Sequence, residues 1–110
     1  MLRARWDQKQ ILCEIKPLGG ELAWVSPWGV GIDLSDIAVS VTALRGMRYT
    51  IPRLVWLNLS ATNASDAALR ELKNARRLES IHLDGAPISA GGLRSLIKLR
   101  HLVEIRISES

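Results

Sequence analysis

The chain has 110 residues, of which 47% are hydrophobic and 24% are charged, and its formal net charge is +4. This balance is typical of a single folded domain and excludes the low hydrophobicity of a disordered chain. Aliphatic residues occur in short, spaced groups, so no stretch approaches the roughly 20 apolar residues that a membrane-spanning helix needs. The basic start, MLRARWDQKQ, lacks the apolar run of a secretory signal, and we therefore expect a cytoplasmic protein.

Residues 8–16, the first candidate element, are compatible with a helix or with a strand. Pro17 lacks a backbone N–H and disfavours a helical residue before it, so a helix here would end by Ile15. Alternatively, Ile11, Cys13 and Ile15 alternate as in a strand, and KPLGGE would form a hairpin turn into ELAWV. The residues alone leave both alternatives open.

Cys13 is the only cysteine of the chain, so it cannot form an internal disulfide. Its aliphatic neighbours indicate a small buried hydrophobic side chain rather than a reactive thiol. One cysteine and two distant histidines, His82 and His101, cannot supply the four ligands of a structural zinc site. We therefore expect no metal.

An internal repeat organises the chain from about residue 30 onward. Three sets of aliphatic residues recur with a displacement of 24: Leu54, Leu57 and Leu59; Leu78, Ile81 and Leu83; Leu102, Ile105 and Ile107. Between them recur Leu69, Leu72 and Ala75, and then Leu93, Leu96 and Leu99. An earlier copy begins at Ile32 with a displacement of 25. The L-x-L spacing places side chains on one face of a strand and L-x-x-L on one side of a helix, so each repeat predicts one strand and one helix.

The repeat predicts four parallel strands, around Ile32, Leu57, Ile81 and Ile105. The helices are expected over residues 41–48, 66–75 and 90–99. Ser40, Ser65 and Ser89 share one repeat position immediately before these helices, where a serine hydroxyl can cap the first turn. Because no single strand–helix unit can bury its own apolar side, the units must stack.

The stretches LVWLNLSATNASDAALRELKNARR and LESIHLDGAPISAGGLRSLIKLRH share the pattern L-x-x-L-x-L-x-x-(T/A)-x-(I/A)-S-x-x-x-L-x-x-L. This pattern resembles the leucine-rich repeat, in the bacterial form L-x-L-x-x-T-x-(I/V)-(T/S)-D-x-x-L-x-x-L that is close to the ribonuclease-inhibitor-like class. The resemblance covers about residues 30–108. It implies an α/β solenoid shaped as a short horseshoe, with a parallel sheet on one face and helices on the other. Residues 30–110 would hold about three repeats and a final strand.

Residues 8–34 resemble the segment that precedes such bacterial arrays, in which a helix ends in L-G-G and a strand leads to V-x-(V/I)-D-L-S. The matching residues are Leu18, Gly19, Gly20 and 30–35, while Pro17 departs from the pattern. We therefore favour a helix over residues 8–16 and interpret residues 1–29 as an N-terminal cap. Trp6, Trp24 and Trp28 are the candidates to cover the core of the first repeat.

The chain contains no recognisable catalytic motif, phosphate-binding loop or ligand cluster, and we predict neither an enzyme nor a cofactor. Gly19–Gly20 and Gly91–Gly92 lack the spacing of a nucleotide-binding loop. His82 lies between core positions and points to the same side of its strand as Asp84. A solvated or partner-contacting histidine explains this pair better than catalysis.

Side chains that alternate with the core residues form the first candidate binding surface, on the exposed face of the sheet. They are Asp33, Ser35, Trp56, Asn58, Ser80, His82, Glu104 and Arg106. Asp33, Asn58, His82 and Arg106 would form one polar row beside Trp56, the residue type that most often anchors protein interfaces. The alternative is that Trp56 packs against the cap. The sequence predicts a protein–protein interaction module whose partner it does not identify.

The second candidate surface is the helical side, where Arg45, Arg70 and Arg94 recur once per repeat and Lys73 enlarges the patch. Residues 45–100 contain ten Lys or Arg and four Asp or Glu, a net of six positive charges. Such a surface can attract nucleic acid or another anion. We favour anion binding on this surface less than protein binding on the sheet face, because no aromatic residues are interleaved for base stacking.

The predicted array ends with the strand around Ile105, which leaves one sheet edge without a neighbour. We therefore expect either that the chain self-associates through this edge or that it is an accessory subunit or fragment of a larger complex.

Overall fold

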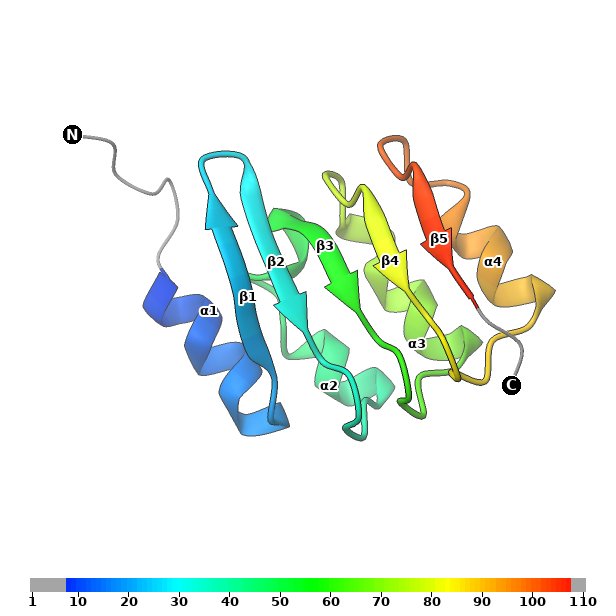
Figure 1. Ribbon diagram of the computed structural model, residues 1–110, viewed down its shortest axis with the longest axis horizontal. Helices are drawn as coiled ribbons and strands as arrows, with labels where there is room; N and C mark the ends of the chain where they lie inside the picture. The colour runs from blue at the N-terminus through cyan, green and yellow to red at the C-terminus, as the bar shows by residue number, and fades with distance from the viewer. Residues whose placement is uncertain (1–7, 108–110) are drawn as a thin grey trace.

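The protein forms a five-stranded sheet with helices on one side, in a computed structural model that describes residues 8–107 (Figure 1). The strands are β1 (Glu21–Ser26), β2 (Gly29–Asp33), β3 (Leu54–Asn58), β4 (Ser80–His82) and β5 (Glu104–Arg106). The α-helices are α1 (Gln8–Ile15), α2 (Val41–Arg45), α3 (Asp66–Arg70) and α4 (Ala90–Leu96). Short 3₁₀ segments, η1 (Lys16–Leu18), η2 (Ile51–Arg53) and η3 (Glu71–Asn74), follow the first three helices.

The sheet is mostly parallel, and its spatial order β1-β2-β3-β4-β5 is the order along the chain. The hairpin β1–β2 is antiparallel, and the pairs β2–β3, β3–β4 and β4–β5 are parallel. Leu57 pairs with Ile81, and Ile81 pairs with Ile105. Residues 24 positions apart in sequence are thus direct cross-strand neighbours, which confirms the four predicted parallel strands.

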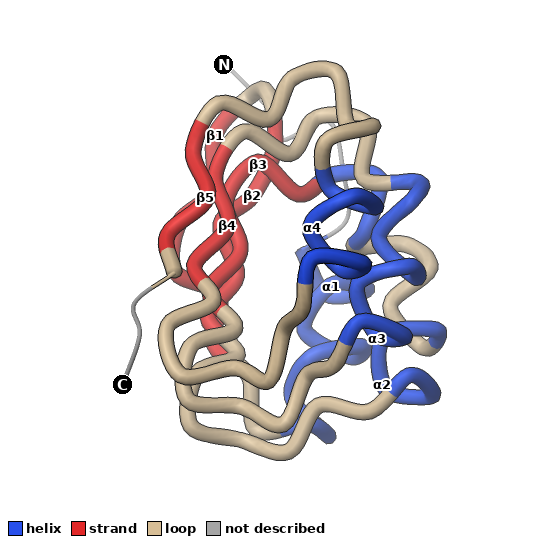
Figure 2. Tube along the Cα trace, turned by 90° about the vertical axis from the view of Figure 1, so that its right-hand side faces the viewer, coloured by secondary structure: helices blue, strands red, loops and turns tan. Residues whose placement is uncertain are grey.

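The core lies between the sheet and the helices, all of which cover the same face of the sheet (Figure 2). Leu54, Leu57, Leu78 and Ile81 are fully buried, as the aliphatic spacing predicts. We call the other face of the sheet, which no helix within residues 8–107 covers, the open face. Among the described residues, no helix is long and apolar enough to cross a membrane.

The helices are shorter than the sequence predicts, because their last turns tighten to hydrogen bonds between residues three apart. The N–H of Ala75 donates to the carbonyl of Leu72 at 2.8 Å, and that of Leu99 donates to Leu96 at 2.9 Å. The L-x-x-L spacing is therefore compatible with an α-helix and with a tighter 3₁₀ turn, and here each predicted helix contains both.

Two of the three predicted serine caps form. The Ser40 hydroxyl accepts from the Ala43 N–H at 3.0 Å, and the Ser89 hydroxyl accepts from the Gly91 N–H at 3.2 Å. Ser65 occupies the N-cap position of α3 without a side-chain hydrogen bond to the helix, so the prediction is wrong there.

The N-terminal segment is helical, which confirms helix over strand for residues 8–15. Ile11 and Ile15, four residues apart, are fully buried. Cys13 lies two residues from each and therefore points to another side of α1, where it is exposed. The prediction of a buried cysteine is wrong, because it rested on the type of the neighbouring residues and not on helical geometry. Trp6 lies outside the described residues.

Candidate functional site

Two rows of side chains cross the open face from β1 to β5, and strand register defines both. One row contains Trp24, Gly31, Trp56, Ser80 and Glu104. The other contains Glu21, Asp33, Asn58, His82 and Arg106. The predicted polar row is therefore continuous, and Trp56 lies in the row beside it.

Trp24 belongs to the open face and not to the core. A Cβ atom on Gly31 would overlap the indole ring of Trp24, so the ring lies against the bare backbone of Gly31. Gly31 lies between the buried residues Val30 and Ile32, and its Cβ direction is opposite to that of Ile32. Trp24 remains 38% exposed in this position. The prediction that Trp24 covers the core is wrong, and the open face gains a second tryptophan.

Trp28 does not cover the core either. It lies in the turn between β1 and β2 and is 72% exposed. Its backbone carbonyl accepts a hydrogen bond from Arg77 Nη1 at 2.9 Å. Trp28 borders a surface hollow with Val55, Arg77, Glu79 and His101. The buried residues Ile11 and Ile15 on α1 belong to the core instead.

Trp56, Ser80, His82 and Glu104 come together on β3, β4 and β5, and we call them the Trp56 cluster. The rings of Trp56 and His82 meet edge to face, with centroids 5.2 Å apart and planes at 79°. Such aromatic contacts are favourable at this separation. Ser80 Oγ donates to Glu104 Oε1 at 2.6 Å, and His82 Nε2 lies 3.5 Å from the same oxygen. Trp56 is partly buried, so it packs within the sheet face and still offers surface.

Hydrogen bonding lowers the pKa of Glu104. The donated Ser80 hydroxyl is the main cause that holds the pKa of Glu104 below its ordinary value, with smaller contributions from His82 and Arg106. A hydrogen bond to a carboxylate stabilises its ionised form. Ser80 and His82 therefore hold this carboxylate beside the aromatic pair.

Asp33 and Asn58 lie on the open face and also accept hydrogen bonds from the local backbone. Asp33 Oδ1 accepts from the Ser35 N–H at 2.9 Å, and Asn58 Oδ1 accepts from the Ser60 N–H at 2.9 Å. Side-chain oxygens of this kind stabilise the turn that follows each strand. Each residue keeps its second polar atom for another contact. Both side chains therefore stabilise turns in addition to lining the open face.

The open face is acidic and the helical side is basic. The two rows carry Glu21, Asp33 and Glu104 against the single guanidinium of Arg106. On the helical side, Arg70, Arg94 and Lys73 are exposed. The molecule is thus polarised across the sheet, and each side would attract partners of opposite charge.

The predicted arginine column is partly neutralised by neighbouring acids. Arg45 forms an ion pair with Glu71. The hydrogen bond that Asp66 accepts from the Ser89 hydroxyl is the main cause of its lowered pKa, and the nearby cation of Arg70 contributes less. Arg94 remains exposed on α4.

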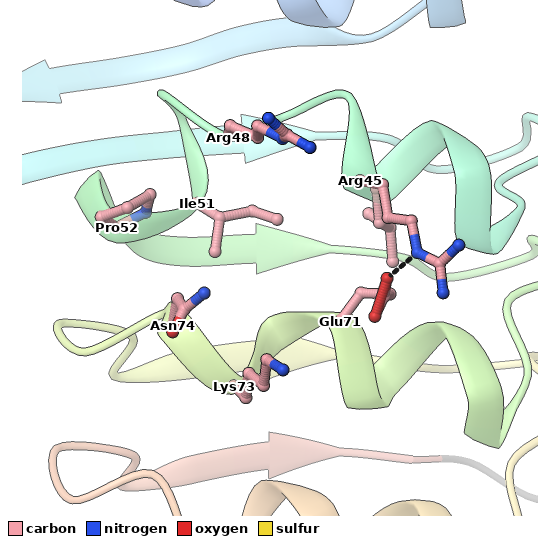
Figure 3. Close-up of a pocket in the computed structure, with 8 residues that line it drawn as sticks. Arg45, Arg48, Ile51, Pro52, Glu71, Lys73 and Asn74 are labelled. Atoms are coloured by element: carbon pink, nitrogen blue, oxygen red, sulfur yellow. Dashed lines mark hydrogen bonds and ion pairs between the residues drawn. The ribbon is translucent and has the colours of Figure 1, made fainter.

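A surface hollow of about 530 Å³ lies on this helical side, beside α2, η2 and η3. Figure 3 shows Arg45 and Glu71 joined at one end, with Arg48 and Lys73 on separate elements. The lining residues are Leu44, Arg45, Arg48, Ile51, Pro52, Glu71, Lys73 and Asn74. Three cations and one carboxylate give the hollow a net positive charge.

The part of the chain that the structure describes brings together no three His, Cys, Asp or Glu side chains that could hold a metal ion. His82 lies at the end of β4 and contacts Glu104, and Asp84 follows two residues later. No protein-family model, curated protein or solved structure matches this chain.

Proposed function

We propose that this chain is a short leucine-rich-repeat domain that binds a protein partner on the open face of its sheet and has no catalytic activity. The direct pairing of residues 24 apart on parallel strands supports the repeat architecture. The observation that supports the binding site is the gathering of Trp24, Trp56 and His82 on a face that no helix covers. Tryptophan is enriched at interface hot spots, and a pre-packed ring loses little freedom on binding.

The charge of the open face indicates what the partner carries. Three carboxylates and one guanidinium favour a partner segment with Lys or Arg side chains. Such a cation can pair with Glu104 or stack on an indole ring. The partner we propose is therefore a basic protein segment with an apolar anchor.

A random peptide library displayed on phage tests this proposal. We expect the wild-type chain to enrich peptides with Lys or Arg next to an aromatic or aliphatic residue. Trp56→Ala should fail to retain these peptides, while Trp28→Ala, which removes an exposed tryptophan in the hairpin turn, should retain them. Peptides that Trp56→Ala retains equally well would contradict the proposed site.

The compartment we propose is the cytoplasm. Cys13 is exposed and unpaired, and a free thiol persists most readily in a reducing compartment.

Anion binding on the helical side is the second candidate function, and the cationic hollow beside Arg48 and Lys73 favours it. Binding through several phosphate contacts weakens steeply as salt rises, whereas an aromatic anchor is much less sensitive. Titration of a fluorescent oligonucleotide at low and high salt distinguishes the two functions. Unchanged binding by a variant in which Arg45, Arg70 and Arg94 are all replaced by Glu would reject this candidate.

A further inference from the structure

The outer edge of β5 has backbone groups that no described strand pairs. β5 is the last strand in the sheet order. The carbonyl of Arg106 accepts from the Leu83 N–H at 2.7 Å, and the Glu104 N–H donates to the Glu79 carbonyl at 3.0 Å. Both groups face β4. Because successive residues of a strand direct their backbone groups to opposite edges, the N–H and C=O of Ile105 point to the outer edge.

The same end of the molecule exposes apolar side chains. Val103 is 84% exposed, Ile97 is 73% exposed and Ile107 is 45% exposed. A surface hollow of about 320 Å³ lies there, lined by Ile97, Leu99, Leu102, Val103, Glu104 and Ile105. Leu57 and Ile81 each pair with a strand on both sides, but among the described residues Ile105 pairs with a strand on one side only. An open strand edge next to exposed apolar side chains is a site of association.

We propose that this edge pairs with the β5 edge of a second copy of the chain, antiparallel and centred on Ile105. In that register the two Ile105 residues exchange both backbone hydrogen bonds across a twofold axis. Glu104 then lies opposite Arg106 of the second copy, and Arg106 lies opposite its Glu104. Opposite charges at directly paired positions stabilise an antiparallel pair.

The sequence Glu104-Ile105-Arg106 is thus complementary to itself only in the antiparallel direction. A parallel pairing in register would place Glu104 beside Glu104 and Arg106 beside Arg106, and like charges at paired positions are destabilising. In the antiparallel arrangement the two apolar hollows also lie at the same interface, because both adjoin Ile105. Charge and apolar surface therefore favour the same twofold dimer.

The opposite edge of the sheet is protected in a way that the β5 edge is not. The pairing of β1 with β2 shifts register between Leu22 and Trp24, which indicates a β-bulge. Bulges disrupt the regular ladder that a further strand would need. Helix α1 also covers this end of the core through the fully buried Ile11 and Ile15.

Charge exchange tests the register of the dimer. We expect the molar mass of the wild-type chain, measured by light scattering or sedimentation, to rise from monomer to dimer across the micromolar range. Glu104→Arg and Arg106→Glu each place like charges opposite one another, so each should weaken the dimer at least about tenfold. The double variant carrying both changes, and an equimolar mixture of the two single variants, should restore the dimer.

Val103→Lys should also weaken the dimer, because it places a charge in the apolar hollow. The control is Cys13→Lys, an exposed position on α1 at the β1 end of the sheet, which should dimerise as the wild-type chain does. Far-UV circular dichroism of dilute samples should match wild type for every variant. A wild-type chain that stays monomeric, oligomers that grow beyond a dimer, or single charge variants that dimerise as well as the double variant would overturn the proposal.

Discussion

Glu14 on α1 accepts hydrogen bonds from both the backbone N–H and the side-chain hydroxyl of Thr50, at 2.8 and 2.6 Å. The second oxygen of the same carboxylate accepts from the Tyr49 N–H at 3.0 Å. Thr50 is fully buried, and 36 residues separate it from Glu14. One partly buried carboxylate therefore attaches the N-terminal helix to the turn before β3.

Glu14→Ala should lower the free energy of unfolding by about 2 kcal/mol, because it leaves buried donors without an acceptor. Chemical denaturation monitored by circular dichroism measures this change. Glu79→Ala, which removes an exposed glutamate, is the matched control and should change stability by less than about 0.5 kcal/mol. Equal effects of the two substitutions would show that α1 is held by apolar contacts alone.

Gly31→Ala should displace the Trp24 ring from the open face, because the new methyl group would occupy the position of the indole. The expected cost is about 1–3 kcal/mol of stability, the usual range for overpacking. In a double-mutant cycle, Trp24→Ala should remove most of this cost by vacating the space. Additive effects would mean that the two residues do not compete for one position.

Ser80→Ala should raise the pKa of Glu104 toward its ordinary value of about 4.5, because the Ser80 hydroxyl is the main cause of its depression. A carboxyl group with a lowered folded-state pKa contributes stability above its unfolded-state pKa and loses it as pH falls through the folded-state value. The Ser80–Glu104 contribution is therefore present at neutral pH and lost in acid. NMR titration of the Glu104 carboxyl measures the shift. The pKa of Asp66, which depends on Ser89, should stay unchanged and serves as the internal control.

Glu71→Gln should strengthen anion binding on the helical side, because it releases Arg45 from its ion pair without changing the shape of the hollow. Titration with a fluorescent oligonucleotide at low salt measures the effect, which added salt should remove. If Glu71→Gln binds no more tightly than wild type, the hollow is not an anion site.

Strand placement was predictable because it depends on side-chain type and spacing alone. Leu57 and Ile81 must face the core, so Trp56 and His82 must face away from it, and the structure has both pairs in these positions. Neither the contact between the two rings nor the hydrogen bond from Ser80 follows from alternation, because side-chain rotamers decide them.

The position of Trp24 depends on the hairpin register and on the bulge between Leu22 and Trp24. A single irregular residue reverses which face the following side chain occupies, so the simple alternation of ELAWV was not sufficient. The signal that could have identified Trp24 is Gly31, a glycine inside an otherwise apolar strand, which marks a close approach by another group. Of the three open-face carboxylates, the sequence predicted Asp33 and Glu104 but not Glu21, which joins the face through the pairing of β1 with β2.

The affinity of Trp56→Ala for a phage-selected basic peptide, measured by calorimetry together with its thermal unfolding, tests the claim that the open face binds the partner. The open-face site predicts a loss of about 2 kcal/mol or more in binding, roughly 30-fold, with the fold retained. His82→Ala should lose less, and Trp28→Ala should bind as wild type does. A large fall in the unfolding temperature of Trp56→Ala with unchanged peptide affinity would contradict the claim, because Trp56 would then serve packing and the partner would bind elsewhere.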